Sequence, residues 1–405
     1  MNKSILYISI LGMSEPLGKS QVLEYIKDLA KNYNMNLYSF EKDLTAQTIS
    51  ELNQVMENEN ISWKYQRYNN KYGVFSTIIQ IFTSFFELKK LIKDKNIKVI
   101  HARSLIPTVI ALILKIFCDV KVIADIRGFQ IDEKAEVGRI KKKSFLYKLL
   151  KKLEQTTYKK SDSIVSLTHS AIDYIKNFTN KEKVTVIPTC ANDKVFYKVS
   201  DEERTKLKEE LGYKIDDVIL LHAGAVSNWY DFDNELKIIS KLFQTNEKIK
   251  YLILNKGEHD FISKKLLEYK IDKSRVEVKE SNFYEVYKYL NISDASIFII
   301  KPTFAKKASA PTKFAENLCC GLFSITNNGI GDMNSFFEKN DTLGYSFDIQ
   351  DINTKLDSIC ENISIRMKKE RLDSEYKNTY YENFSKDMAI EKYSNIYNTL
   401  LGQNK

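Results

Sequence analysis

The sequence contains few cysteines for its length, and they are scattered. Five cysteines occur among 405 residues, mostly within apolar runs and without the spacing of metal ligands. A disulfide framework or a zinc site is therefore not indicated, and a reducing cytoplasm is the simplest setting. Zinc-finger spacing, arginine-rich tracts and an aromatic RNA-binding signature are also absent, so the net charge of +9 is weak evidence for a nucleic-acid partner.

Long hydrophobic runs are missing as well. The most apolar segments, residues 74–86 and 105–118, fall short of the about 20 residues that cross a bilayer. Residues 1–11 join a lysine to an apolar stretch, but Ser9 interrupts that stretch and no small-residue cleavage site precedes Glu15. We expect this segment to be a first strand and the protein to be cytoplasmic.

Strand-like and helical segments alternate along the chain, which is typical of an α/β protein with parallel sheets. Strands are expected at residues 4–11, 35–41, 97–103, 120–127, 163–168 and 184–188, and again at 218–224, 250–256, 276–280 and 295–300. Helices of the first half are expected at residues 20–32, 76–95, 106–117, 144–160 and 170–178. A charged stretch after Phe196 begins a new unit, so we expect two Rossmann-like, doubly wound domains of roughly 150 to 200 residues. Such domains would face a cleft at the carboxyl ends of their strands.

The segment from Ser309 to Asp332 carries the most chemistry. Its proline suits the first turn of a helix, Ser309 can cap the free amides, and Gly321 can end the helix in a left-handed conformation. The N-terminus of such a helix favours a phosphate or diphosphate, and Lys313 adds a full positive charge there. Glu316, one turn later, could accept hydrogen bonds from both hydroxyls of a ribose. The alternative is an ordinary amphipathic helix with a Lys313–Glu316 surface ion pair.

This segment resembles the donor-binding motif of the GT-B glycosyltransferases, particularly family 4. Glu316 matches the second of two family glutamates, whereas Ala308, eight positions earlier, stands where the first would contact the transferred sugar. A branch of these enzymes has a similar Ser-Pro-Thr-Lys stretch ahead of the remaining glutamate. The resemblance implies an acceptor-side domain at residues 1–200, a nucleotide-sugar-binding domain at 201–385 and a helix at 386–405 that crosses back to the first domain.

The resemblance also implies an activity. It implies transfer of a hexose-type sugar from a nucleotide diphosphate sugar to a glycan or lipid-linked acceptor, in bacterial surface polysaccharide or glycoconjugate synthesis. The reaction would retain the anomeric configuration and use neither a metal nor a cofactor, because Lys313, the helix N-terminus and loop amides would stabilise the leaving diphosphate.

Residues 222–232 occupy the place of the family's glycine loop beneath the nucleotide. Gly224 and Asn228 are the expected donor contacts there. Family members often have an arginine and a lysine nearby, and this stretch has neither, so Lys256 or Lys301 would supply the charge. The aromatic pair that follows could stack on a base or pack in the core.

The loop from Gly12 to Gln21 ends in Leu-Gly-Lys-Ser, like the P-loop of nucleoside triphosphatases. However, five residues rather than four separate Gly12 from Gly18, and Pro16 removes a backbone donor. By resemblance, the amides around Gly18 and Ser20 would face the donor or the acceptor. A tight turn into a helix is the alternative.

Two further loops follow strands of the first domain. His101 and Arg103 end one strand, where an arginine can clamp a phosphate and a histidine is more often structural. Asp125 and Arg127 end the next strand, with Glu133 nearby, and charges there must pair or meet a ligand. In the family this strand end usually offers a catalytic histidine, so Asp125 and Arg127 are the candidates for catalysis here. An ion-pair network of Arg127 with Asp125 or Glu133 is the alternative.

Residues 138–160 contain nine basic residues and one acidic residue, with leucines at helical spacing. This pattern is typical of a basic amphipathic helix. The helix either packs on its own domain with a solvated lysine face, or docks on anionic lipid as a peripheral membrane protein would. The second interpretation would suit an acceptor carried on a polyprenyl diphosphate.

Three other functions remain open. A nucleotide-sugar 2-epimerase shares the two-domain plan, and a P-loop phosphotransferase would bind ATP with magnesium. A non-catalytic GT-B partner subunit is favoured by Ala308 and by the missing arginine and lysine of the glycine loop.

Overall fold

The computed structural model describes residues 3–42, 44–68, 74–369 and 372–403. The chain forms two compact units, residues 1–188 with 386–405, and residues 189–385. The second unit begins before residue 200, because Ala191 already packs in its core and accepts a hydrogen bond from the hydroxyl of Tyr380 at 3.1 Å.

The first unit is built around a seven-stranded parallel sheet with the order β3-β2-β1-β4-β5-β6-β7. Its strands are β1 (Ser4–Ser9), β2 (Asn34–Glu41), β3 (Ser62–Arg67), β4 (Val99–Arg103), β5 (Lys121–Asp125), β6 (Ser163–Ser166) and β7 (Val184–Val186). Its helices are α1 (Pro16–Gly18), the π-helical turn η1 (Lys19–Leu23), α2 (Glu24–Ala30), α3 (Ala46–Asn58), α4 (Val74–Asp94), α5 (Leu105–Phe117), α6 (Gln130–Glu136), α7 (Phe145–Lys160), α8 (Ile172–Ile175), the 3₁₀ turn η2 (Lys181–Lys183) and α17 (Lys386–Leu400).

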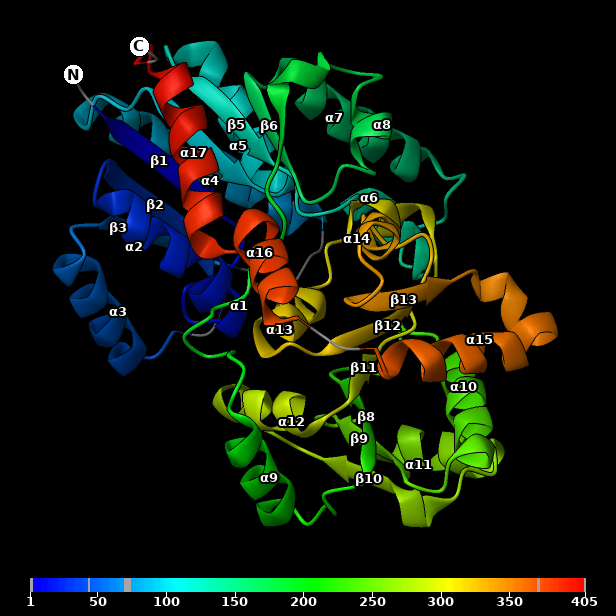
Figure 1. The fold of residues 1–405 in the computed structure, drawn as a ribbon. Coiled ribbons are helices and arrows are strands. Elements are labelled where there is room, and N and C mark those ends of the chain that lie inside the picture. Colours follow the sequence, from blue (N-terminus) through cyan, green and yellow to red (C-terminus); the bar gives the residue numbers. More distant parts are fainter. Residues whose placement is uncertain (1–2, 43, 69–73, 370–371, 404–405) are drawn as a thin grey trace. The chain divides into compact units, whose positions relative to one another are not determined.

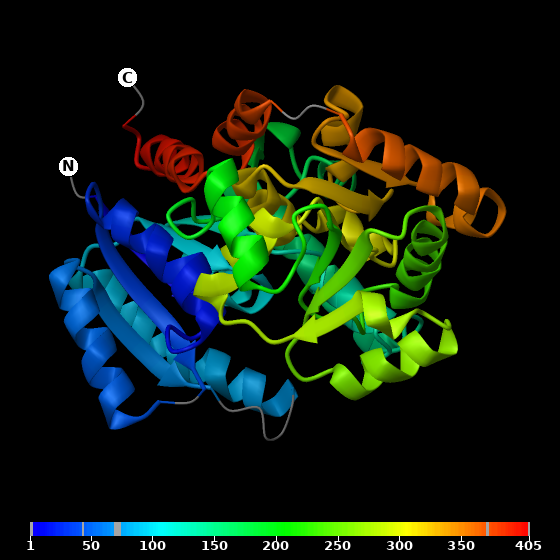
Figure 2. The ribbon, with the colours of Figure 1, turned by 60° about the horizontal axis from the view of Figure 1, so that its bottom comes forward.

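Helices cover both faces of this sheet, and its central strands are correspondingly apolar. Every residue of β1 and β4 is buried, as expected for parallel strands enclosed on both sides. Helix α17 joins this unit from the far end of the sequence and packs against α2 (Figures 1 and 2). The ammonium of Lys386 lies 2.7 Å from Asp28, and the hydroxyl of Tyr33 donates to Asn398 at 2.9 Å.

The second unit contains a six-stranded parallel sheet with the order β10-β9-β8-β11-β12-β13. Its strands are β8 (Val218–Ala223), β9 (Ile249–Leu254), β10 (Val276–Lys279), β11 (Ala295–Ile297), β12 (Phe323–Asn327) and β13 (Gly344–Phe347). Its helices are α9 (Asp201–Glu210), α10 (Phe232–Thr245), α11 (His259–Glu268), α12 (Val286–Ile292), α13 (Thr312–Cys320), α14 (Met333–Lys339), α15 (Ile352–Met367) and α16 (Asp373–Asn383), with 3₁₀ turns η3 (Lys273–Arg275), η4 (Phe283–Glu285), η5 (Phe304–Ala308) and η6 (Ile349–Asp351).

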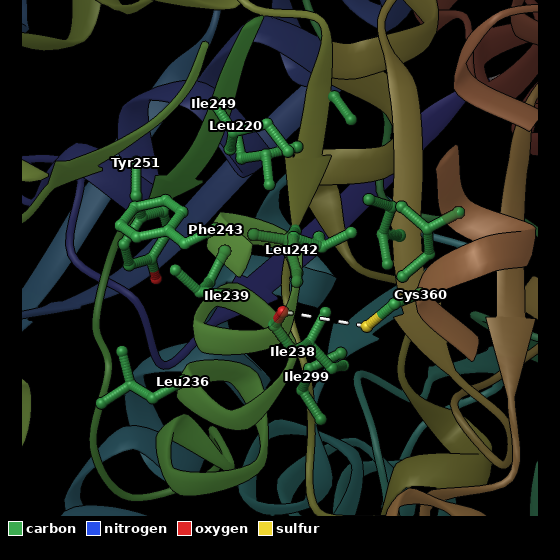
Figure 3. Packing of buried hydrophobic residues seen from close by; sticks show 14 of the residues in the cluster. Leu220, Leu236, Ile238, Ile239, Leu242, Phe243, Ile249, Tyr251, Ile299 and Cys360 are labelled. Carbon is green, nitrogen blue, oxygen red and sulfur yellow. Dashed lines mark hydrogen bonds between the residues drawn. The ribbon is translucent and has the colours of Figure 1, made fainter. Parts of the chain in front are cut away.

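The largest core of the second unit joins this sheet to helices α10 and α15. Leu242 and Phe243 of α10 pack in one cluster with Leu220 of β8 and Tyr251 of β9 (Figure 3). Cys360 of α15 belongs to the same cluster, and burial raises the pKa of its thiol to about 12. Cys360 is therefore a packing residue, and all five cysteines of the chain are free thiols.

In both sheets the strand order reverses beside the first strand of the unit. The reversal lies between β1 and β4 in one sheet and between β8 and β11 in the other. Ligands of doubly wound folds bind beyond the carboxyl ends of the strands at such a switch point. The expected α/β class with two parallel sheets is confirmed, and the loops after these four strands are the places to look for a site.

Some local expectations were wrong. Helix α3 and strand β3 occupy a region where we expected neither. None of the six residues of the edge strand β3 is buried, and its sequence contains no apolar run. The helix expected at residues 144–160 is α7, which Ser144 caps by accepting from the amide of Tyr147 at 3.1 Å. The basic residues 138–143 precede α7 in turns and bends, and α6 begins at Gln130, inside the segment 124–134 that we expected to be a loop.

Candidate functional site

The switch point of the second unit brings two loops together. The amide of Asp231, in the loop after β8, donates to the carbonyl of Ile299 at 2.8 Å. The amide of Lys301 donates in return to the carbonyl of Trp229 at 2.9 Å. These bonds fix the glycine loop that follows β8 against the segment that leads to α13.

Lys313, in the first turn of α13, lies against this glycine loop. Gly224 has a φ of 113°, and a β-carbon at that position would lie 3.3 Å from both Cε and Nζ of Lys313. The Nζ atom is 3.9 Å from the ring centroid of Tyr230, and among the described residues it is buried without a hydrogen-bond partner. An anion beside Gly224 would supply the acceptors that this ammonium lacks.

Glu316 follows Lys313 by one turn of α13. Burial raises the pKa of Glu316 to about 7, and the charge of Lys313 opposes this rise. The surface ion pair that the sequence left open is not formed: within the described part of the chain neither side chain has a salt-bridge partner. Both side chains are therefore available to a ligand.

The ends of α13 were predicted with mixed success. Gly321 ends the helix in the left-handed conformation with a φ of 65°, as expected. Ser309 does not cap the helix, which was wrong, because Pro311 takes the N-cap position and Ser309 ends the preceding turn η5. Ala308, at the position of the first family glutamate, is only 1% exposed and presents no polar side chain to the site.

The glycine loop is held by a residue that sequence reasoning missed. Glu258, at the start of α11, accepts from the amide of Val226 at 2.9 Å, from Asn255 at 2.7 Å and from the hydroxyl of Ser227. Burial would raise the pKa of Glu258, but these hydrogen bonds lower it below its usual range. A carboxylate three positions after Asn255 gave no recognisable motif, because its other two partners lie on the loop after β8.

The other predicted donor contacts are more exposed. Asn228 is exposed at the tip of the glycine loop with a φ of 57°, and its carbonyl accepts from the ammonium of Lys301 at 2.8 Å. Lys301, which we expected to supply a positive charge to the diphosphate, thus donates to the glycine loop instead. Lys256 is exposed in the turn after β9. The aromatic rings of the loop lie beside lysines: the ammonium of Lys306 is 3.7 Å from the ring centroid of Trp229.

In the first unit, Asp125 is the centre of a buried polar cluster. It is fully buried and lies 3.4 Å from His101 Nε2, 3.4 Å from Arg103 and 3.5 Å from Arg127. Burial alone would raise the pKa of Asp125, but these three neighbours hold it well below its usual range. The Asp125–Arg127 ion pair that the sequence left open is therefore present.

The same cluster includes α17. The hydroxyl of Tyr397 lies 2.6 Å from His101 Nδ1, and that of Tyr393 lies 3.4 Å from Asp125. Burial lowers the pKa of His101, and Asp125 opposes this effect. The net lowering favours a neutral imidazole ring. His101 and Asp125 are both 0% exposed. In this arrangement the carboxylate of Asp125 holds the side chains of Arg103 and Arg127 in place.

Near this cluster lies a strained residue that the pattern alone did not mark. Ser104, directly before α5, has a φ of 80° and a ψ of 172°, a conformation that side chains with a β-carbon rarely adopt. Its amide donates to the carbonyl of Asp125 at 2.9 Å. Glu133 lies one helix turn into α6, and Glu133 Oε1 would be 3.5 Å from a β-carbon on Gly128.

Gly18 and Ser20 do not lie in an open loop, which corrects our expectation. Gly18 belongs to α1, and a β-carbon on it would lie 1.8 Å from the carbonyl oxygen of Gly12. Ser20 donates its hydroxyl to the carbonyl of Pro16 at 3.0 Å. The loop amides of Met13 and Ser14 are occupied by the buried carboxylate of Glu41, at 2.7 and 3.1 Å. A P-loop geometry is thus not formed, and donor contacts of Gly18 and Ser20 stay predictions.

The structure therefore groups the predicted residues in two places. Gly224 and Lys313 meet at the switch point of the second unit, with Glu316 one turn further along α13. His101, Arg103, Asp125 and Arg127 meet near strand ends of the first unit. Within the described part of the chain, no group of three or more histidine, cysteine, aspartate or glutamate side chains is placed to hold a metal ion.

Comparisons with known proteins bear on the fold and on part of the sequence. Residues 43–194 match the family model described as Glycosyltransferase Family 4. A glycosyltransferase from Rickettsia africae ESF-5 is similar with a TM-score of 0.73 at 16% identity, with 100% of both chains covered. Sucrose-phosphate synthase from Thermosynechococcus elongatus has a TM-score of 0.72 at 12% identity, also over 100% of both chains. Anabaena HepE in complex with UDP-glucose has a TM-score of 0.66 at 12% identity, covering 98% of this chain and 99% of that one. No curated protein matches in sequence.

The chain thus has the GT-B fold of glycosyltransferases. Over residues 43–194 the sequence is similar to Glycosyltransferase Family 4. The resemblance that the motifs indicated is confirmed by both findings.

Proposed function

We propose that the chain transfers a hexose-type sugar from a nucleotide diphosphate sugar to a glycan or lipid-linked acceptor. The observation that carries this proposal is the ammonium of Lys313 beside Gly224, at the switch point of the second unit, which is buried and has no hydrogen-bond partner among the described residues. A diphosphate is the ligand that fits this position, because it offers several anionic oxygens to one ammonium, to the first turn of α13 and to loop amides.

Glu316 supports the nucleotide part of the proposal. A ribose presents two neighbouring hydroxyls, and a carboxylate one helix turn from the diphosphate site can accept from both. Burial raises the pKa of Glu316. Two hydrogen bonds from the ribose to the charged carboxylate would offset this effect. The UDP-glucose bound to Anabaena HepE is a ligand of this class.

We propose further that transfer retains the anomeric configuration and needs no metal. Lys313 would balance the charge that develops on the leaving diphosphate, which is the task a divalent ion performs in other transferases. Arg127, held by Asp125, is the candidate for the acceptor side of the reaction. Surface polysaccharide or glycoconjugate synthesis is the biological setting that we propose for such an acceptor.

A panel of nucleotide sugars tests this proposal. The purified chain should hydrolyse at least one donor slowly and transfer its sugar faster when a suitable acceptor is added. Formation of a C2-epimeric product without acceptor would favour a 2-epimerase instead. Tight donor binding without hydrolysis or transfer would favour a non-catalytic partner subunit, which Ala308 would suit. Failure to bind any nucleotide sugar would overturn the proposal.

A further inference from the structure

Helix α7 is oriented with its apolar residues outward. Phe145 is 81% exposed and Leu149 is 52% exposed, and Leu146 and Leu153 are exposed as well. A helix that packs on its own domain normally turns such a stripe inward. Helix α7 does pack on its own unit, against α5 and α6, but through another face, so the apolar stripe stays exposed.

The inward side of α7 is polar instead. Lys151 is buried with its ammonium 2.7 Å from Asp132, and it also pairs with the buried carboxylate of Glu154. Its ammonium lies 4.8 Å from the ring centroid of Tyr174. Because this charged network fixes the rotation of the helix, the leucine stripe cannot turn inward without breaking buried ion pairs, which would be costly.

A second apolar ridge lies on the same side of the sheet. Helix α5 packs between α4 and α7 (Figure 1). Phe82 and Phe86 of α4 are 64% and 58% exposed, and Ile116 and Phe117 at the end of α5 are 76% and 59% exposed. The ridge is held together by aromatic contacts, since the ring of Phe85 lies 5.3 Å from Phe86 and 5.4 Å from Phe117.

Basic residues lie beside both apolar features. The exposed basic residues within 138–160 are Arg139, Lys141, Lys142, Lys143, Lys148, Lys152, Lys159 and Lys160, and the only acid of that segment is the buried Glu154. At the ridge, the ammonium of Lys89 lies 5.2 Å from the ring centroid of Phe117. Lysines beside exposed aromatic and leucine side chains can reach lipid phosphates while the apolar groups enter the acyl region.

We propose that the α4–α5–α7 face of the first unit docks on an anionic lipid bilayer, with the α4–α5 ridge as a second insertion point beside α7. We choose an anionic bilayer as the partner because the excess of exposed lysine on this surface complements anionic lipid headgroups. The described residues contain no helix that is long and apolar enough to span a membrane. The attachment is therefore peripheral, and it needs neither donor nor acceptor, so its failure would leave the transfer reaction untouched.

Insertion of apolar side chains makes lipid binding less sensitive to salt than a purely electrostatic attachment would be. Each exposed phenylalanine or leucine that enters the acyl region adds a contribution that salt does not screen, whereas the lysine contribution falls with ionic strength. We therefore expect raised salt to weaken binding without abolishing it. We expect Lys141→Glu with Lys142→Glu and Lys143→Glu to remove the preference for anionic lipid.

Co-sedimentation of the full chain tests the proposal, using vesicles of phosphatidylglycerol with phosphatidylcholine and vesicles of phosphatidylcholine alone. The pairs Phe82→Ser with Phe117→Ser, and Phe145→Ser with Leu149→Ser, should each weaken binding to the anionic vesicles about tenfold or more. Leu267→Ser, at a leucine of the second unit that is 71% exposed, is the matched control and should bind like the wild type.

Three results would overturn the proposal. The wild type could ignore anionic vesicles, or the ridge variants could bind as tightly as the wild type. The serine variants could instead convert a dimer to a monomer without changing sedimentation, which would assign the face to a second copy of the chain. All variants change exposed residues, and their unfolding curves, measured alongside, separate lost docking from lost folding.

Discussion

Lys313 keeps an ammonium buried without a hydrogen-bond partner among the described residues. A buried charge without partners destabilises a fold by several kcal/mol, so such a group is retained where a ligand supplies the partner. Tyr230 offers partial compensation through its ring, at 3.9 Å. Glu316 is in a similar state, since its desolvation is not balanced by a hydrogen bond within the described chain. These two residues carry the functional argument.

Replacing Glu316 by glutamine tests the ribose contact. Loss of charge-assisted hydrogen bonds costs about 1.5 to 3 kcal/mol, so we predict that Glu316→Gln weakens donor binding about 10- to 150-fold. The variant removes a poorly solvated charge, so without ligand at about pH 8 it should be at least as stable as the wild type in urea. Unchanged donor affinity in a calorimetric titration would refute the ribose assignment.

The pKa of Glu316 predicts a pH dependence. Its folded value of about 7 lies above the about 4.3 of an unfolded chain. Protonated Glu316 therefore adds stability that is fully present below about pH 4.3 and is lost as pH rises through about 7. Donor binding needs the carboxylate, so affinity should instead rise about tenfold between about pH 6 and pH 8. Glu316→Gln should show a flat profile, and a flat profile in the wild type would contradict this role.

Among the elements, α17 is the one whose position decides the first-unit cluster. Its Tyr397 contacts His101 at 2.6 Å, and its Tyr393 approaches Asp125. The helix is far away in sequence, yet its two tyrosines complete this buried polar cluster. Asp125 stabilises this interior above its unfolded pKa of about 3.9, and that stability is lost as pH falls toward its depressed folded value.

We predict that Tyr397→Phe lowers the free energy of unfolding by about 1 to 3 kcal/mol, because it leaves a buried histidine nitrogen without its partner. Urea unfolding at neutral pH measures this. Tyr381→Phe is the control, because Tyr381 is 54% exposed and its hydroxyl can bond to water. Equal effects of the two substitutions would show that the His101 contact is not important for stability.

Arg127 is the residue of this cluster that we propose to act in the reaction. We predict that Arg127→Ala lowers turnover at least about tenfold while donor affinity stays within about twofold, because the donor site lies in the other unit. Single-turnover kinetics with a fixed donor would separate the two effects. Full turnover in the variant would leave Arg127 only its ion pair with Asp125.

The elements that the sequence predicted well are those with a local signal. Buried strands such as β1, β5 and β8 are apolar runs, and α13 has a proline and a glycine at its ends. Edge strand β3 has no such run and was missed. The rotation of α7 was not predictable, because it depends on Asp132, which belongs to another helix.

At the scale of the whole molecule, each unit has its own parallel sheet, core and switch point. The predicted site residues divide between the units in the same way. Gly224, Lys313 and Glu316 could be found from the sequence because glycine and helix-end signals are local. Glu258 and Glu41 could not, because the loops that they hold are contacted through long-range hydrogen bonds.

Binding of UDP and UMP to the wild type and to Lys313→Ala tests the central claim most directly, with the guanosine pair used if the donor panel selects it. The two ligands differ by the phosphate that Lys313 should hold. We predict that the substitution weakens diphosphate binding about tenfold or more and monophosphate binding by less than about twofold. Equal losses for the two ligands, or no binding of any nucleoside diphosphate by the wild type, would contradict the assignment of this site.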